Sequence, residues 1–146
     1  MTNEYRRSTH SVFNLQVHIS WITKYRYHVL KGAIGERAKV LIRRICVDNN
    51  VEILKGTISA DHIHLHLSMD PSIAISQLVK MMKGKTSHQL QMEFPELKKR
   101  YWGQHLWARG YFAVSVGNVT AKMLQEYLEH HFEGKEGEDA FRVETP

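Results

Sequence analysis

The sequence predicts an α+β sandwich in which helices pack on a largely antiparallel sheet. Short runs that alternate apolar and polar residues, as strands do, are interleaved with longer runs whose apolar residues recur every three or four positions, as in amphipathic helices. The 146 residues contain no internal repeat and no convincing linker, which favours one domain. We expect that domain over residues 1–133, followed by a loosely ordered tail over residues 134–146.

The first half of the chain predicts a strand, a helix and a hairpin. Residues 12–22 alternate in polarity and predict the first strand. Residues 35–49 carry the apolar stripe of an amphipathic helix. The β-rich runs 51–59 and 62–69 are separated by only two residues and predict a hairpin.

The second half predicts two longer helices, a short basic segment and a strand. Residues 73–92 have one apolar face and predict a helix, and residues 94–105 predict a short basic helix followed by a loop. Residues 106–116 predict a strand interrupted by Gly110, where we expect a bulge or a close approach of the backbone. Residues 120–133 predict the last helix. The predicted order is β-α-β-β-α-β-α.

The composition limits the class of protein. The formal net charge is +5 and the sequence pI is about 9.4, which favours a polyanionic partner such as nucleic acid. A single cysteine, Cys46, excludes an internal disulfide and a cysteine-based zinc cluster. No apolar run approaches the ~20 residues of a membrane helix, and the polar N-terminus lacks the apolar core of a signal peptide. We therefore expect a cytoplasmic protein without a membrane partner.

Three histidines alternate with aliphatic residues in the stretch SADHIHLHLSMD. On a strand, His62, His64 and His66 share one face, and their aliphatic neighbours face the core. The β-carbons of His62 and His64 lie roughly 7 Å apart on such a strand, so that both imidazoles can reach one metal ion. A polar sheet face with hydrogen-bonded histidines explains the pattern as well, and the stretch alone leaves both interpretations open.

The predicted last helix contains a second group of reactive residues. Tyr127 and His131 are four positions apart, and His130 is three from Tyr127, so these side chains can look out over one face. Leu124 and Leu128 lie mostly on the buried side. A tyrosine in such a helix is usually half-buried, with its hydroxyl at the rim. Together with the strand histidines, however, it suggests a metal site facing a phenol and one more ligand.

DHIHLHLS resembles the histidine–hydrophobic–histidine (HUH) motif of the single-tyrosine transposases of the insertion-sequence 200/605 group, whose relatives include the REP-associated tyrosine transposases. The segments TKYRYHVL, KGKTSHQL, LWARGYFAVSVGNVT and EYLEHHF are similar to further segments of that family, in matching order. The resemblance covers roughly residues 12–133. It implies a ferredoxin-like HUH endonuclease that excises and inserts single-stranded DNA with hairpin ends.

The resemblance also implies roles for single residues. Tyr127 is then the nucleophile that forms a 5′-phosphotyrosine bond, and His62 and His64 hold a divalent cation. His131 completes the site at a position where the family usually has glutamine. Because three imidazoles are softer ligands than carboxylates, they favour Mn²⁺ over Mg²⁺. The resemblance further implies a homodimer with active sites shared between subunits, acting at the nucleoid.

Basic residues interleaved with aromatic ones are candidates for contacts with DNA, because cations neutralise phosphates and aromatic rings stack on unpaired bases. The candidates are Lys24, Arg26, Lys83, Lys85 and Arg109. Two other enzymes stay open: a domesticated relative that cuts repetitive chromosomal hairpins, and a zinc hydrolase that uses His62, His64 and His66. A DNA-binding module without catalysis is disfavoured, since Tyr127 and both motif histidines are present.

Overall fold

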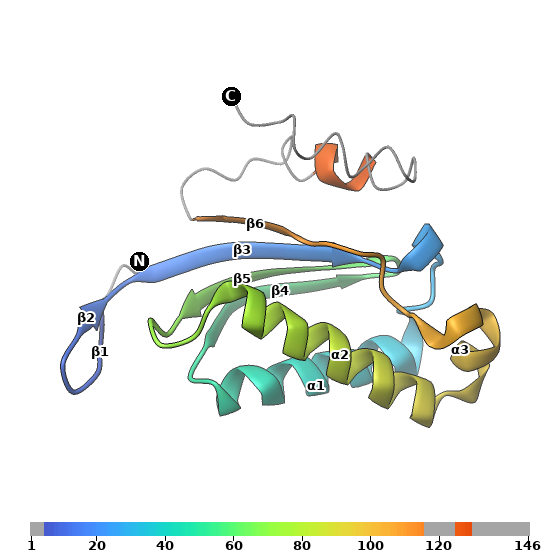
Figure 1. Ribbon diagram of the computed structural model, residues 1–146, viewed down its shortest axis with the longest axis horizontal. Coiled ribbons are helices and arrows are strands. Elements are labelled where there is room, and N and C mark those ends of the chain that lie inside the picture. Colours follow the sequence, from blue (N-terminus) through green and yellow to red (C-terminus); the bar gives the residue numbers. More distant parts are fainter. Residues whose placement is uncertain (1–4, 116–124, 130–146) are drawn as a thin grey trace.

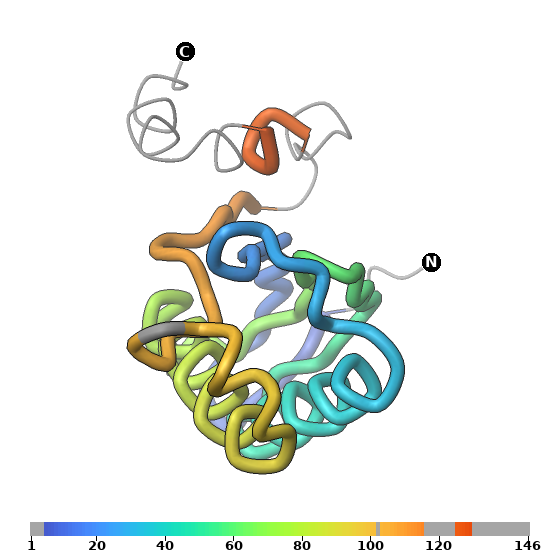
Figure 2. The backbone as a smooth tube through the Cα atoms, turned by 90° about the vertical axis from the view of Figure 1, so that its right-hand side faces the viewer, coloured from blue at the N-terminus to red at the C-terminus, as the bar shows by residue number. Residues whose placement is uncertain are grey.

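A computed structural model describes residues 5–115 and 125–129 of the chain. At its centre is a four-stranded antiparallel sheet in the order β4-β5-β3-β6, and two long helices, α1 and α2, cover one face of it (Figure 1). The elements are β1 (Arg6–Arg7), β2 (Val12–Phe13), β3 (Leu15–Ile22), η1 (Lys24–Arg26), α1 (Gly32–Asp48), β4 (Glu52–Ser59), β5 (His62–Met69), α2 (Ile75–Glu93), α3 (Pro95–Arg100), η2 (Trp102–Gln104) and β6 (Phe112–Ser115). Residues 125–129 are helical and lie over the opposite face of the sheet (Figures 1 and 2).

The predicted fold class is confirmed. The succession β3-α1-β4-β5-α2-β6 is the β-α-β-β-α-β order of a ferredoxin-like fold, with the hairpin of β4 and β5 where the sequence places it. The last helix, predicted over residues 120–133, is described only at residues 125–129. The rest of that helix and the predicted tail lie outside the described residues.

The core lies between the sheet and the two long helices. On β5, Ile63, Leu65 and Leu67 are at most 3% exposed, because every second side chain of the strand faces α1 and α2. Each side chain of this size contributes roughly 1.5–3 kcal/mol when it is buried. The helices meet them with the residues of their apolar stripes, Ala38, Leu41, Ile42 and Ile45 on α1 and Leu78, Val79, Met82 and Leu90 on α2. Among the described residues, no helix is both long and apolar enough to cross a bilayer.

The strand predicted over residues 12–22 is divided in two. Its first part, β2, pairs with β1 in a separate two-stranded ribbon, and Asn14 separates it from β3 in the main sheet. Arg6 attaches this ribbon to the main sheet, because its Nη1 donates a hydrogen bond to the Ser68 carbonyl at 2.9 Å. The alternation of polarity continues across the break, so the pattern did not reveal it.

The strand predicted over residues 106–116 begins only at Phe112. Two carbonyls of the preceding segment, those of Ala108 and Gly110, accept hydrogen bonds from Lys83 Nζ on α2, each at 2.9 Å. The segment meets the end of β3 only in an isolated bridge, between Trp107 and Thr23, with a hydrogen bond from the Ala108 N–H to the Ile22 carbonyl at 3.0 Å. Its carbonyls at Ala108 and Gly110 face Lys83, and the regular ladder with β3 starts at Phe112. Gly110 has a φ of 81°, a conformation that glycine adopts without steric cost, and it directs the chain into β6.

Candidate active site

The face of the sheet opposite the long helices carries the histidines. The register of β3 and β5 pairs Ile22 with His62, Ser20 with His64 and His18 with His66. All three histidines of β5 are partly buried, whereas their aliphatic neighbours face the core. The predicted division of this strand into a polar and an apolar face is therefore confirmed.

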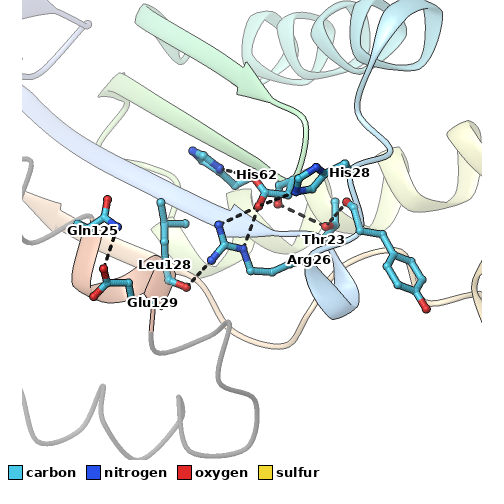
Figure 3. A network of polar contacts seen from close by, with 9 residues as sticks. Thr23, Arg26, His28, His62, Gln125, Leu128 and Glu129 are labelled. Carbon is cyan, nitrogen blue, oxygen red and sulfur yellow. Dashed lines mark hydrogen bonds and ion pairs between the residues drawn. The ribbon is translucent and has the colours of Figure 1, made fainter.

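Asp61 holds His62 in place. The Nδ1 atom of His62 lies 2.9 Å from Oδ1 of Asp61, and the other carboxylate oxygen accepts a hydrogen bond from Arg26 Nε at 2.9 Å and forms an ion pair with Arg26 Nη2 at 2.8 Å (Figure 3). Burial by itself raises the pKa of Asp61, but the hydrogen bonds from His62 and Arg26 and the charge of Arg26 outweigh it and lower this pKa. Asp61 is thus an ionised acceptor placed against Nδ1 of His62, and this arrangement leaves Nε2 as the nitrogen of His62 that can face a metal ion.

Arg26 reaches this position from an unusual backbone conformation. Tyr25 and Arg26 have φ values of 61° and 52°, in the left-handed region that costs a residue with a side chain about 1 kcal/mol or more. The turn aims the guanidinium at Asp61 and, on its other side, at the helix of residues 125–129, where Nη1 donates to the Leu128 carbonyl at 2.9 Å (Figure 3). One side chain therefore connects the β5 site to that helix.

His64 contacts a histidine that sequence analysis missed. Its Nε2 lies 3.3 Å from Nδ1 of His18, and the ring of His18 stacks on that of His66 with centroids 4.3 Å apart. Burial, followed by the charges of neighbouring imidazoles, lowers the pKa of His18 and of His64, while burial lowers that of His66. These shifts favour the neutral form of all three rings, which is the form that binds metals. The alternation of residues 12–22 could have placed His18 on the polar face of the sheet, but only the register of β3 against β5 shows that it lies beside His64 and His66.

Tyr127 lies against the same face of the sheet, in a small apolar cluster with Ile22, Leu128, Ala108 and Phe112. It is 1% exposed, which differs from the expected position with the hydroxyl at the rim of the helix. Burial raises the pKa of Tyr127 well above its usual value near 10, and the nearby charge of Arg26 acts in the opposite direction. In this conformation the side chain of Tyr127 is therefore buried, and burial favours the protonated form of its phenol.

The predicted third metal ligand, His131, and its neighbour His130 lie outside the described residues. Within residues 5–115 and 125–129, no group of three or more His, Cys, Asp or Glu side chains could hold a metal ion. His66, the ligand in the hydrolase interpretation, places its Nε2 2.9 Å from Oε1 of Gln16 and its ring against His18. The structure thus gives His66 other partners.

The five predicted DNA contacts are in different situations. Arg26 is bound to Asp61 and Leu128, and Lys83 to two backbone carbonyls, so both have structural partners. Lys24 lies over the ring of Tyr25 at 5.4 Å. Lys85 and Arg109 are exposed.

Lys83 also lines a pocket of about 670 Å³ between α2 and the segment that leads to β6. Lys80 and Lys98 also line this pocket, and among the described residues that line it none is Asp or Glu. Burial lowers the pKa of Lys83 to about 8. The absence of carboxylates from this lining makes the pocket a candidate surface for a phosphate backbone.

The geometry can be compared with known proteins. The family model described as "Transposase IS200 like" matches residues 11–131. The ISDra2 transposase TnpA of Deinococcus radiodurans is 33% identical over 126 residues, which are 86% of this chain and 90% of that protein. The transposase for insertion sequence element IS200 of Salmonella typhimurium is 36% identical over 124 residues, covering 85% of this chain and 81% of its own.

Solved structures show the same similarity. A crystal structure of a Deinococcus radiodurans protein described as a transposase matches with a TM-score of 0.78 and 31% identity, over 85% of this chain and 95% of that one. A REP-associated tyrosine transposase bound to a REP hairpin matches with a TM-score of 0.57 at 15% identity, over 91% of this chain and 75% of that one, which shows a shared fold. Because the family model spans residues 11–131 and both relatives are at least 33% identical over 85% or more of this chain, the chain belongs to the IS200-like transposase family.

Proposed function

We propose that this transposase cleaves and rejoins single-stranded DNA, with Tyr127 as the nucleophile and a divalent cation held by His62 and His64. One observation carries the proposal. The guanidinium of Arg26 binds both Asp61, which holds His62, and the carbonyl of Leu128, which follows Tyr127 in the chain. The proposed ligand His62 is thus connected, through Asp61 and Arg26, to the helix that carries the proposed nucleophile.

The two strand histidines suit a divalent cation. His62 lies with Nδ1 against the Asp61 carboxylate, which leaves Nε2 for a metal, and burial lowers the pKa of His64, which favours its neutral, metal-binding form. His131 is the proposed third ligand, and an all-imidazole set favours Mn²⁺ over Mg²⁺. When bound, such a cation supplies neutralisation of the charge on the phosphoryl oxygens.

The reaction conserves the number of phosphorus–oxygen bonds. The phenol oxygen of Tyr127 forms a bond to phosphorus, and the bond from phosphorus to the 3′ oxygen of the preceding nucleotide breaks. The phenol loses its proton and the leaving oxygen gains one, which yields a 5′-phosphotyrosine and a free 3′-OH. Attack by a 3′-OH on the phosphotyrosine reverses these changes, so strands are rejoined without ATP.

The burial of Tyr127 adds a conformational step. A phenol with a pKa near 10 already costs about 4 kcal/mol to ionise at pH 7, and its apolar surroundings raise that cost. We therefore propose that the described arrangement is a resting state, in which contacts with Ile22 and Phe112 cover the phenol. The helix of residues 125–129 has to move before Tyr127 reaches a phosphate.

Charge and similarity support hairpin-ended single-stranded DNA as the substrate. The net charge is +5, and the pocket beside α2 presents lysines without carboxylates. A neighbour in fold was solved bound to a REP hairpin. We further propose a homodimer in which the tyrosine helix leaves the Arg26 of its own chain and completes the site that β5 of the other subunit provides, so that the described contact belongs to the resting state. Cutting of chromosomal hairpins by a domesticated relative uses the same site, and the choice of DNA distinguishes the two.

An adduct assay tests the chemistry. The protein is incubated with end-labelled single-stranded DNA hairpins and Mn²⁺, and covalent adducts are resolved on a denaturing gel. We expect an adduct with the parent protein and with Tyr5→Phe, a change at a 69% exposed tyrosine, but none with Tyr127→Phe. Cleavage that survives Tyr127→Phe and requires His66 contradicts the proposal and supports the hydrolase.

Complementation tests the shared sites. A His64→Ala chain and a Tyr127→Phe chain are each expected to be inactive, because one lacks a ligand and the other the nucleophile. Mixing them restores adduct formation if a site takes its ligands and its tyrosine from different subunits. An inactive mixture, with mixed dimers verified by mass spectrometry, contradicts that arrangement.

A further inference from the structure

We propose that His18 is a positioning residue that sets the tautomer of His64. In this arrangement Nδ1 of His18 accepts a hydrogen bond from the Nε2–H of His64, so that Nδ1 of His64 keeps a lone pair for the cation. The inference rests on the proposed function in one respect, since it takes His64 to be a metal ligand.

The strand register brings the two rings together. Ser20 is directly opposite His64 and His18 is opposite His66, so His18 is the diagonal neighbour of His64 across β3 and β5. The contact joins Nδ1 of His18 to Nε2 of His64 at 3.3 Å. A neutral imidazole has one N–H and one lone pair, so one ring must donate and the other must accept.

Metal binding decides the direction of this hydrogen bond. If His64 accepted at Nε2, its proton would be on Nδ1, and neither nitrogen would offer a lone pair to a cation. If His64 donates from Nε2, its Nδ1 is available. Asp61 does the same for His62, whose Nδ1 donates and whose Nε2 is available. Each proposed ligand therefore has its own orienting partner, as ligating histidines in metalloproteins usually do.

His18 is itself held in place. Its ring stacks on His66 with centroids 4.3 Å apart and an interplanar angle of 10°. His66 Nε2 in turn lies 2.9 Å from Oε1 of Gln16. His66, the extra histidine of the strand, thus supports His18 and through it His64.

Two substitutions of similar size separate this role from simple packing. His18→Asn places an amide oxygen where Nδ1 lies and can still accept from His64, whereas His18→Leu cannot. Binding of Mn²⁺ and of Zn²⁺ is measured by calorimetry without DNA. We expect His18→Leu to weaken both by roughly 10- to 100-fold, the usual effect of losing an orienting partner, and His18→Asn to restore most of the affinity.

A control and a spectroscopic measurement complete the test. His66→Leu removes the ring stacked on His18 but leaves the hydrogen-bonding atoms of His18 and His64, and we expect a smaller loss of affinity than for His18→Leu. ¹⁵N–¹H NMR of the imidazoles in the zinc-loaded protein should show His64 protonated on Nε2 with the metal on Nδ1. Thermal unfolding verifies that each variant is folded.

Three results overturn the inference. They are unchanged metal affinity in His18→Leu, a metal-bound Nδ1 on His18 itself, and a His64 protonated on Nδ1 in the zinc-loaded protein. Failure of the proposed function is recognised separately, as the absence of a Tyr127-dependent adduct on any DNA hairpin, because the metal titrations contain no DNA.

Discussion

The two faces of the central sheet are built from the same strands but have opposite tasks. On one face of β5, Ile63, Leu65 and Leu67 are buried beneath α1 and α2. On the other, His62, His64 and His66 are partly buried and bonded to polar partners from β3 and from the turn before β5. The comparison teaches that alternation along one strand separates stability from chemistry, so that neighbouring residues should fail in different ways when they are changed.

The largest expected difference is between Leu67→Ala and His64→Ala. Leu67 is fully buried, and its truncation should lower the free energy of unfolding by about 2–5 kcal/mol in urea titrations. His64→Ala should change that free energy by less than about 1.5 kcal/mol, the range of one ordinary hydrogen bond, but abolish the covalent DNA adduct. A His64 variant as unstable as the Leu67 variant would contradict the division between the faces.

The next largest effect concerns Arg26. Arg26→Lys keeps the charge but loses the planar fork that binds Asp61 and Leu128 at the same time. We expect adduct formation to slow by roughly 10- to 100-fold, as for other partners that orient a ligand, with little change in DNA affinity. DNA affinity is measured in a binding assay, and the rate of adduct formation is measured with DNA in saturating excess. If Arg26→Lys lowers the affinity but leaves that rate unchanged, Arg26 is instead the DNA contact that the sequence predicted.

A smaller effect is the dependence of stability on pH. The pKa values of His18, His64 and His66 are below 6.5 in the folded chain, so that between pH 6.5 and these values the unfolded chain binds more protons than the folded one. The free energy of unfolding should therefore fall as the pH decreases below about 6.5. We expect the free energy of unfolding, measured in urea titrations from pH 7.5 to 5.5, to depend less steeply on pH when His18 and His66 are replaced by leucine. A variant whose free energy of unfolding depends on pH as steeply as that of the parent would contradict the presence of buried neutral histidines.

The smallest expected effect lies away from the histidine face. Lys80→Ala with Lys98→Ala removes two exposed charges at the pocket beside α2 and should weaken binding of single-stranded DNA. Each phosphate contact that is lost lowers the slope of log affinity against log salt by about 0.7. Arg43→Ala with Arg44→Ala, on the outer surface of α1, is the control with the same change in charge. Equal effects of the two pairs would show that only net charge matters.

What the sequence predicted well was local. The two-residue period of residues 62–69 predicted both the strand and the face on which each histidine lies, because that period follows from strand geometry. The apolar stripes of α1 and α2 were predicted in a similar way, because a helix brings every third or fourth residue to one face. Prediction failed where the backbone has distant partners. Lys83 donates hydrogen bonds to the carbonyls of Ala108 and Gly110, which are 25 and 27 positions away, and no local sequence pattern reveals these bonds.

The residues of the candidate site were predicted one by one, but most of their contacts were not. Asp61, which lies against His62, is its neighbour in the sequence, whereas the other contacts around His64 and the tyrosine helix join residues far apart in the chain. Arg26 and Leu128 are 102 positions apart, and His18 and His64 are 46 apart. Arg26 looked like a surface cation because a sequence does not show which carboxylate a guanidinium will meet.

The left-handed turn at Tyr25 and Arg26 has a consequence for how the tyrosine helix can be released. Two side-chain-bearing residues in that conformation are under strain, and the bonds of Arg26 to Asp61 and Leu128 offset it. In the movement proposed above, Arg26 would give up the Leu128 carbonyl, and the strained turn would lose one of the bonds that stabilise it. Relaxation of the turn would then offset part of the free energy lost with the Leu128 contact, which would lower the cost of opening the site.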